Sequence, residues 1–158
     1  MSEADTCCEL ITPAIRAAGW DNEPHSIVEQ YSFTDGRIVV SGNKAKRQPQ
    51  KRADYLLRYT GDFPIAVVEA KDQVGYAPGD GLQQAKDYAF ILGLKFAYST
   101  NGNGIIEFDF FTGKERPLSV FPTPQELWDR WKAGETVIGA SSEKVEKGIL
   151  EPYYHMNG

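Results

Sequence analysis

The chain has 158 residues, a length that suits one domain able to bury a core without disulfides or a structural metal. Its net charge of −5 argues against binding nucleic acid through bulk positive charge, although a local basic patch stays compatible with a nucleic-acid enzyme. Cys7 and Cys8 are adjacent, so they form neither a disulfide framework nor a zinc ligand set. The N-terminus is polar and acidic, without a signal-peptide pattern, and no apolar run is long enough to cross a membrane. We therefore expect a reduced, cytoplasmic domain with no membrane partner.

The N-terminal third of the chain predicts a helix and then a β-hairpin. Residues 2–18 carry an apolar stripe that stops at Gly19, and Pro13 either kinks this helix or moves its start to about Thr12. Residues 26–33 and 37–40 have strand character on either side of a turn at residues 34–36, which is typical of a hairpin.

A polar loop is predicted at residues 41–52, and it concentrates basic side chains. Such a run is commonly a solvated loop, but this one leads directly into Asp54, so contact with phosphate groups is an equally good interpretation. The basic residues are Lys44, Lys46, Arg47, Lys51 and Arg52.

The next segment predicts two strands joined by a tight turn. Residues 52–59 are rich in aliphatic and aromatic side chains, Gly61 and Asp62 are turn formers, and residues 63–70 are a largely apolar run that suits a strand buried on both faces. After a loop, residues 81–92 have the apolar spacing of a helix, with Asp80 as its N-cap and Gly93 as its C-cap.

The remaining elements predict an α/β fold. Residues 95–100 read as a buried strand, 101–104 as a turn and 105–111 as a half-exposed strand. A helix begins at 122–124 and runs through Trp131, with Thr123 as N-cap and Glu126 as its capping-box partner. Residues from 133 onward predict a helical or loose polar tail. The strand–helix–strand unit over residues 63–100 should be a right-handed parallel crossover, which gives a mixed central β-sheet flanked by α-helices.

Three charges interrupt the two buried strands: Asp54, Glu69 and Lys71. Burying a carboxylate is costly unless it is paired or binds a metal, so their placement needs a reason. Glu69 and Lys71 are two residues apart and share a strand face, and Asp54 lies beside them if the hairpin pairs in register. Two carboxylates and an ammonium at one end of a sheet would make a Mg²⁺ site with a cation next to it. The alternative is an exposed Asp54 and an ordinary surface pair of Glu69 with Lys71.

The chemistry that this set favours is phosphodiester hydrolysis, which needs an activated water and neutralisation of charge in the transition state. In this hypothesis Asp54 and Glu69 are metal ligands, the Ala70 carbonyl is a third ligand, and Lys71 orients the attacking water. Glu9, on the first helix, is a weaker candidate for a further metal-site carboxylate, since a solvated helix residue is the simpler interpretation.

Gln84 and Tyr88 are four residues apart on the predicted helix at 81–92, so they share a face next to the strand of Glu69. Their amide and phenol could contact a DNA phosphate or base. A Tyr that covers the core beside an exposed Gln is the structural alternative. The sequence has no Walker-type phosphate loop, GxSxG or HExxH motif, and His25 and His155 are isolated.

In the order Asp54, Glu69-Ala70-Lys71 and Gln84-x-x-x-Tyr88, the sequence resembles the PD-(D/E)xK nuclease superfamily, specifically its branch with a downstream QxxxY motif. The phrases CELITPAIRAAGW, ADYLLRY, VVEAK, GLQQAKDYA, FAYSTNG and FPTPQELW are similar to the N-terminal domain of the restriction (R) subunit of type I restriction enzymes. The resemblance covers roughly residues 3–132, and several spaced motifs that agree are far more specific than any one. One departure is Ala53, where the superfamily motif has proline, and this departure is common in the branch.

The resemblance implies a restriction-endonuclease-like fold and a Mg²⁺-dependent endonuclease domain, with Mn²⁺ as a substitute, that cleaves double-stranded DNA. In that family the R subunit works with modification and specificity subunits and carries an ATP-driven translocase, which these 158 residues lack. We expect a nuclease domain over residues 1–132 and a polar tail, or the start of a linker, over residues 133–158. The alternative is a non-catalytic DNA-binding or subunit-docking module of the same fold, against which the intact Asp54, Glu69 and Lys71 set argues.

Overall fold

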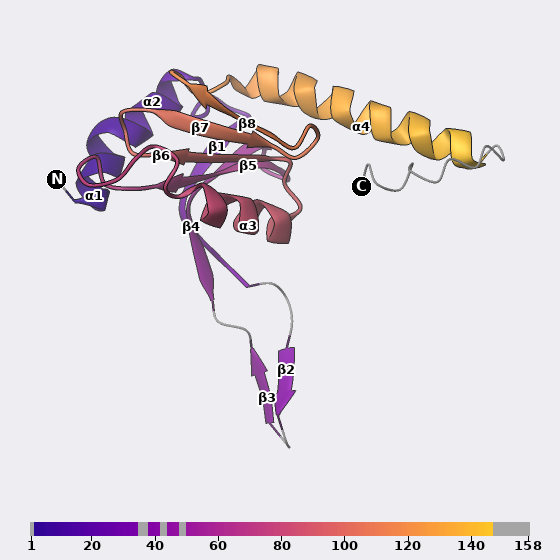
Figure 1. Ribbon diagram of the computed structural model, residues 1–158, viewed down its shortest axis with the longest axis horizontal. Coiled ribbons are helices and arrows are strands. Elements are labelled where there is room, and N and C mark those ends of the chain that lie inside the picture. Colours follow the sequence, from indigo (N-terminus) through magenta and orange to yellow (C-terminus); the bar gives the residue numbers. More distant parts are fainter. Residues whose placement is uncertain (1, 35–37, 42–43, 48–49, 147–158) are drawn as a thin grey trace.

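A six-stranded mixed β-sheet forms the centre of the molecule, and helices cover both of its faces (Figure 1). The computed structural model describes residues 2–34, 38–41, 44–47 and 50–146, with the backbone alone at 38–41, 44–47 and 138–146. The strands of the sheet are β1 (Ser26–Phe33), β4 (Lys51–Thr60), β5 (Phe63–Ala70), β6 (Phe96–Thr100), β7 (Ile105–Asp109) and β8 (Lys114–Leu118). Their spatial order is β1-β4-β5-β6-β7-β8, with β5 and β6 parallel and the other neighbours antiparallel.

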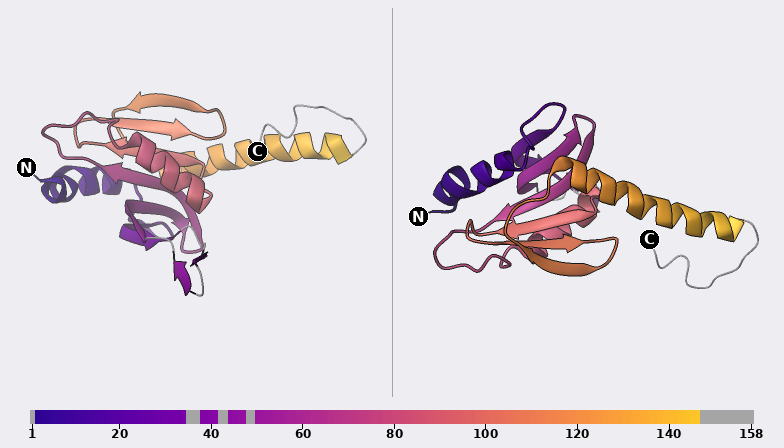
Figure 2. Two further views of the ribbon diagram at one scale, coloured as in Figure 1. Left: turned by 60° about the horizontal axis from the view of Figure 1, so that its bottom comes forward. Right: turned by 90° about the horizontal axis from the view of Figure 1, so that it is seen from above.

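The two faces of the sheet are covered by different helices. On one face lies α3 (Leu82–Leu92), whose Ala85 and Ala89 pack with Leu56 and Val67. The other face carries the N-terminal helical run and α4 (Pro124–Glu146), and Leu127 of α4 is fully buried there. Figure 2 shows this arrangement from two further directions. The predicted α/β fold and the parallel crossover through the helix at 82–92 are confirmed.

The N-terminal helix is continuous but changes its winding before Pro13. It consists of α1 (Glu3–Thr6), a π-helical turn η1 (Cys7–Ile11) and α2 (Thr12–Ala17). Pro13 falls in the first turn of α2, where a missing N–H is tolerated. The wider turn of η1 therefore lets the helix continue through the proline, where the sequence predicted a kink or a later start.

The hairpin predicted from residues 26–33 and 37–40 is wrong. Strand β1 pairs with β4, whereas β2 (Ile38–Ser41) pairs with β3 (Lys44–Arg47) in a separate two-stranded antiparallel ribbon. A turn signal is local, but β4 is ten residues long and offers β1 a longer apolar partner. The polar loop predicted over residues 41–52 is also wrong in part, because residues 44–47 are β3 and residues 51–52 begin β4. Charged side chains do not prevent backbone pairing.

Two further differences concern local signals. The edge strand β8 was not predicted, because its residues are exposed and include the charges and the proline that protect a sheet edge from pairing. Helix α3 has Gly81 at its N-cap position without a side-chain cap, while the Asp80 carboxylate accepts a hydrogen bond from the Ala77 amide instead. The αL C-cap at Gly93, with φ of 75°, is confirmed.

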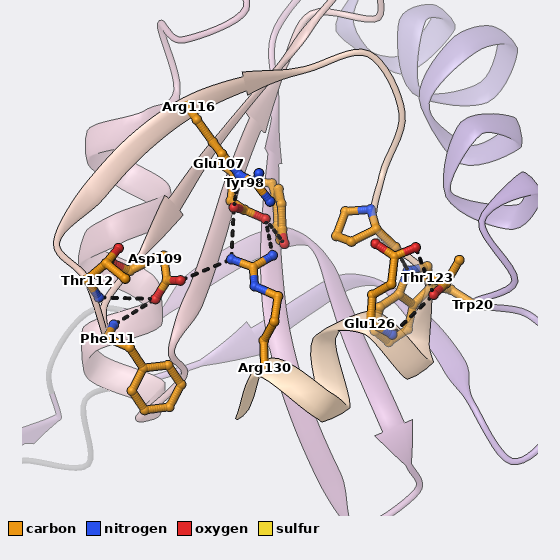
Figure 3. Close-up of polar contacts among 11 residues, drawn as sticks. Trp20, Tyr98, Glu107, Asp109, Phe111, Thr112, Arg116, Thr123, Glu126 and Arg130 are labelled. Carbon is orange, nitrogen blue, oxygen red and sulfur yellow. Dashed lines mark hydrogen bonds and ion pairs between the residues drawn. The ribbon is translucent and has the colours of Figure 1, made fainter. Parts of the chain in front are cut away.

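Helix α4 begins where the sequence predicted and extends through Glu146. The Thr123 hydroxyl accepts a hydrogen bond from the Glu126 amide, as an N-cap should, and donates one to the Glu126 carboxylate. Trp20 donates from Nε1 to the carbonyl of Pro122 at 2.9 Å and so fixes the segment that leads into α4 (Figure 3). None of the helices among the described residues combines the length and apolarity needed to span a membrane.

A buried ion network attaches α4 to the sheet (Figure 3). The Glu107 side chain on β7 is 1% exposed, and both of its oxygens accept from Arg130 of α4 at 3.0 Å. Arg130 also donates to Asp109 at 3.0 Å. Arg116 and the Tyr98 hydroxyl donate to Glu107 as well, at 2.9 and 2.7 Å. Burial alone would raise the pKa of Glu107, but these donors outweigh it and hold the pKa below its usual value.

Candidate active site

The candidate site lies where the ladder between β4 and β5 ends. Backbone pairing stops at Tyr55 and Val68, and beyond this point two carboxylates bridge the strands. The Asp54 amide donates to Oε2 of Glu69 at 2.8 Å, and the Ala70 amide donates to Oδ2 of Asp54 at 2.7 Å. Each carboxylate therefore accepts a hydrogen bond from a backbone amide of the strand that carries the other carboxylate. The predicted juxtaposition of these two residues is present, and it is held by reciprocal hydrogen bonds.

The carboxylate pair is costly to ionise. Glu69 is 3% exposed, and its burial, with the nearby charge of Asp54, raises the pKa of the Glu69 carboxyl to about 8. Burial also raises the pKa of Asp54, against the lowering effect of the Ala70 amide and of neighbouring side chains. A pair of this kind repels itself when both members are ionised, and a divalent cation between them would offset the repulsion.

A cleft of about 380 Å³ opens over the pair and brings together most of the predicted residues. Its lining comes from α1, β1, the start of β4, the end of β5 and α3. The residues are Glu3, Gln30, Gln50, Lys51, Arg52, Asp54, Glu69, Ala70, Lys71, Gln84 and Tyr88. A single concave surface thus joins the three predicted catalytic residues to the two predicted helix residues.

Lys71 directly follows the last residue of β5 and lines the cleft. Its amide donates to the Thr100 carbonyl at 2.9 Å, which extends the pairing with β6 by one residue. Its Nζ lies 5.3 Å from the centroid of the Tyr76 ring, within reach of a cation–π interaction. A Cβ at Gly81 would lie 3.0 Å from Oγ of Ser99, which is a tight contact, and at ordinary contact distance from the side chains of Glu69 and Lys71.

Gln84 and Tyr88 share one face of α3, as their spacing predicted. The Gln84 amide donates to the Tyr88 hydroxyl at 2.6 Å, and both side chains line the cleft. The Tyr88 ring also meets the Phe33 ring edge-on with centroids 5.1 Å apart. Tyr88 therefore packs its ring on the core, as the structural alternative expected, and lines the cleft. The predicted contact of Gln84 and Tyr88 with DNA stays a prediction.

The structure places other predicted residues differently. Glu9 lies on η1, is exposed and does not line the cleft. Glu3, which the sequence interpretation missed, lines it instead, and burial together with the charge of Asp54 raises the Glu3 pKa. The capping box that starts α1 at Ser2 was the available signal, because it places Glu3 in the first helical turn.

Of the basic residues, Lys51 and Arg52 line the cleft at the start of β4. The side chains of Lys44, Lys46 and Arg47 lie outside what the structure describes. Gln30 and Gln50 also line the cleft and were not predicted.

The donor set fits a hard divalent cation. Among the described residues no three His, Cys, Asp or Glu side chains are grouped closely enough to bind a metal by themselves. Backbone amides bond one oxygen of each carboxylate, Oδ2 of Asp54 and Oε2 of Glu69. Two carboxylates and a carbonyl suit Mg²⁺, which usually keeps several waters and is completed by substrate phosphate.

The fold and site have relatives among known proteins. No protein-family model matches the chain. The chain is 37% identical over 141 residues to the endonuclease subunit of the type I restriction enzyme EcoAI from Escherichia coli, with 84% of this chain and 17% of that subunit covered. A solved fragment, assigned as an HsdR subunit of a type I restriction enzyme from Vibrio vulnificus YJ016, is 60% identical, with a TM-score of 0.77 over 86% of this chain and 26% of that one.

These similarities identify the fold first and the relatives second. The mixed sheet with helices on both faces is a restriction-endonuclease-like fold. The homologues of this chain are the endonuclease (HsdR) subunits of type I restriction enzymes, which confirms the resemblance found in the sequence. The chain spans only 17% and 26% of the lengths of these two relatives.

Proposed function

We propose that this chain is the nuclease domain of a type I restriction endonuclease subunit and hydrolyses phosphodiester bonds of double-stranded DNA with Mg²⁺. The observation that carries the proposal is the reciprocally bonded pair of Asp54 and Glu69 beside Lys71 in a cleft. This is the arrangement that the resemblance to PD-(D/E)xK nucleases implies, and the endonuclease names of the homologues support the proposal. Modification and specificity subunits, and an ATP-driven translocase on a longer chain, would complete the enzyme.

The residues of the cleft have different roles in the proposed reaction. Asp54, Glu69 and the Ala70 carbonyl would hold Mg²⁺, which supplies Lewis-acid charge at the scissile phosphate when it is bound. Lys71 donates hydrogen bonds to the attacking water or to a non-bridging phosphate oxygen, and its charge stabilises the transition state. Water attacks phosphorus and releases a proton to the solvent as the bond to the leaving oxygen breaks, and the leaving oxygen takes up a proton from the solvent.

The rim of the cleft provides the groups that hold the DNA strand. Lys51 and Arg52 line the cleft and would contact backbone phosphates, which are the source of most affinity in such complexes. The hydroxyl of Tyr88 and the amide of Gln84 also line the cleft and could hold a phosphate or base by hydrogen bonds.

The test uses variants that separate metal binding from catalysis. Asp54→Asn should abolish Mn²⁺ binding in calorimetry, because it removes one of the two charges that hold the cation. Lys71→Met should keep Mn²⁺ binding and lower cleavage at least a hundredfold, since the ammonium acts on the reacting groups. The matched control is Lys86→Met on α3, because Nζ of Lys86 lies over the Phe108 ring at 4.3 Å, outside the cleft.

Cleavage is measured on plasmid DNA at high protein concentration, and again with the same variants in the longer subunit assembled with its partners. Lys86→Met should cleave like the wild type. Wild-type cleavage by Lys71→Met, or undiminished Mn²⁺ binding by Asp54→Asn, would refute the assignment. If the chain binds DNA, but binds no Mn²⁺ and does not cut DNA in the assembled complex, it is a docking module of the same fold.

A further inference from the structure

Gln30 has a backbone conformation that is rare for its residue type. It lies within β1 with φ of 53°, and among the described residues it is the only non-glycine with a positive φ. This region is unfavourable for a residue with a Cβ, so the strain persists only where the surrounding structure enforces it. Strain of this kind is concentrated at functional sites.

The distortion is confined to one position of the ladder between β1 and β4. Glu29 pairs with Tyr55 and Tyr31 pairs with Ala53, so the register is the same before and after Gln30. No residue has been inserted, which distinguishes the distortion from a β-bulge. This register places Gln30 opposite Asp54, and that pair is the one missing from the ladder.

Gln30 and Asp54 are opposite each other on neighbouring strands and line the same cleft. Burial raises the pKa of Asp54, and hydrogen bonding by Ala70, Glu69 and the Gln30 side chain lowers it. Since the Ala70 amide belongs to β5, the Asp54 carboxylate is restrained from both neighbouring strands.

A neutral amide is the suitable donor at this position. It stabilises an ionised carboxylate without bringing a positive charge, whereas Lys or Arg would compete with a divalent cation for the same oxygens. Groups that orient metal ligands by hydrogen bonds commonly change metal affinity ten- to a hundredfold when they are removed.

We propose that Gln30 is a positioning residue of the cation site: the left-handed conformation of β1 at Gln30 aims its amide at Asp54 and sets the orientation of that carboxylate. The proposal rests on the proposed function for the cation, while the placement of Gln30 opposite Asp54 does not depend on it.

Two substitutions separate the amide from the backbone strain. Gln30→Gly removes the amide and accommodates the positive φ, whereas Gln30→Ala removes the amide and keeps the strain. Both should bind Mn²⁺ about tenfold more weakly than the wild-type chain in calorimetry. In urea without metal, Gln30→Gly should unfold at a higher midpoint than Gln30→Ala. The matched control is Ser32→Gly, an exposed position of the same strand, which should lose stability and keep Mn²⁺ affinity.

A second measurement needs no metal. Equilibrium constants of unfolding are measured for the wild type, Gln30→Gly, Asp54→Asn and the double variant, which together form a double-mutant cycle. The change in this constant in the double variant should differ from the product of the two single changes by roughly threefold or more. If the two single changes simply multiply in the double variant, Gln30 and Asp54 act independently and the proposal is overturned. Mn²⁺ affinity within twofold of wild type in both Gln30 variants would overturn it while leaving the nuclease assignment intact. A wild-type chain that binds no Mn²⁺ would overturn the cation site and this proposal together.

Discussion

Replacing Arg130 by Met should destabilise the domain by about 3 kcal/mol, because it leaves the buried Glu107 carboxylate without its principal partner. Arg130 makes two hydrogen bonds to Glu107 and one to Asp109, and its guanidinium lies 4.8 Å from the centroid of the Phe96 ring. Removing one member of a buried pair costs about 3–5 kcal/mol. We expect the lower end of this range, because Arg130 is 28% exposed and Arg116 remains bonded to Glu107.

The assay is urea unfolding at a series of pH values. The pKa of Glu107 lies below its usual value in the folded protein, so its contribution to the free energy of unfolding is complete above the usual pKa and is lost as the pH falls through the lowered one. The difference between wild type and Arg130→Met should therefore be largest at pH 7 and should shrink toward pH 3. At neutral pH the loss corresponds to a fall in Tm of roughly 6–12 °C.

A matched control lies on the same helix. Lys132 is half exposed and its Nζ is 3.9 Å from Asp129, so Lys132→Met should change the free energy of unfolding by less than about 0.5 kcal/mol. If Arg130→Met unfolds within about 1 kcal/mol of the wild type at pH 7, or if the difference does not fall in acid, the network does not anchor α4 as described.

Three further changes probe the cleft. Gly81→Ala would place a Cβ 3.0 Å from Oγ of Ser99 and 3.4 Å from Cβ of Glu69, so we expect a loss of about 1 kcal/mol in urea unfolding and weaker Mn²⁺ binding in calorimetry. Glu69→Gln should abolish Mn²⁺ binding yet stabilise the metal-free chain by about 1 kcal/mol, since the wild-type carboxyl must take up a proton, or carry a buried charge beside a second carboxylate, when the chain folds near neutral pH; a less stable variant would contradict this. Tyr88→Phe removes the hydroxyl that accepts from Gln84 and keeps the ring, so stability should change by less than about 1 kcal/mol while plasmid cleavage falls.

The parts of the site that the sequence predicted are those defined by local periodicity. Glu69 and Lys71 share a strand face at a spacing of two, and Gln84 and Tyr88 share a helix face at a spacing of four. Asp54 could be added because the turn between β4 and β5 is tight, which makes the register of that pair predictable from nearby residues.

The residues that the sequence did not reveal depend on pairing between distant segments. Gln30 reaches Asp54 only because β1 pairs with β4, while the turn signal after β1 favoured a different partner. Glu3 enters the cleft through the way α1 packs at the end of the sheet. Gln30 has no spacing or residue type that separates it from ordinary surface residues. The capping box at Ser2 places Glu3 in a helical turn, but it does not indicate that this turn meets the cleft.

The attachment of α4 has a mechanical consequence. Figure 1 shows the helix running past the end of the sheet. Arg130 ties the helix to Glu107 and Asp109 of β7, while Trp128 stacks on Tyr59 of β4 and Trp131 packs on Phe63 of β5. A pulling force on the far end of α4 would therefore be shared between β7 and the two strands of the site. It would enter β4 and β5 near the turn that joins them, at the opposite ends of these strands from Asp54 and Glu69.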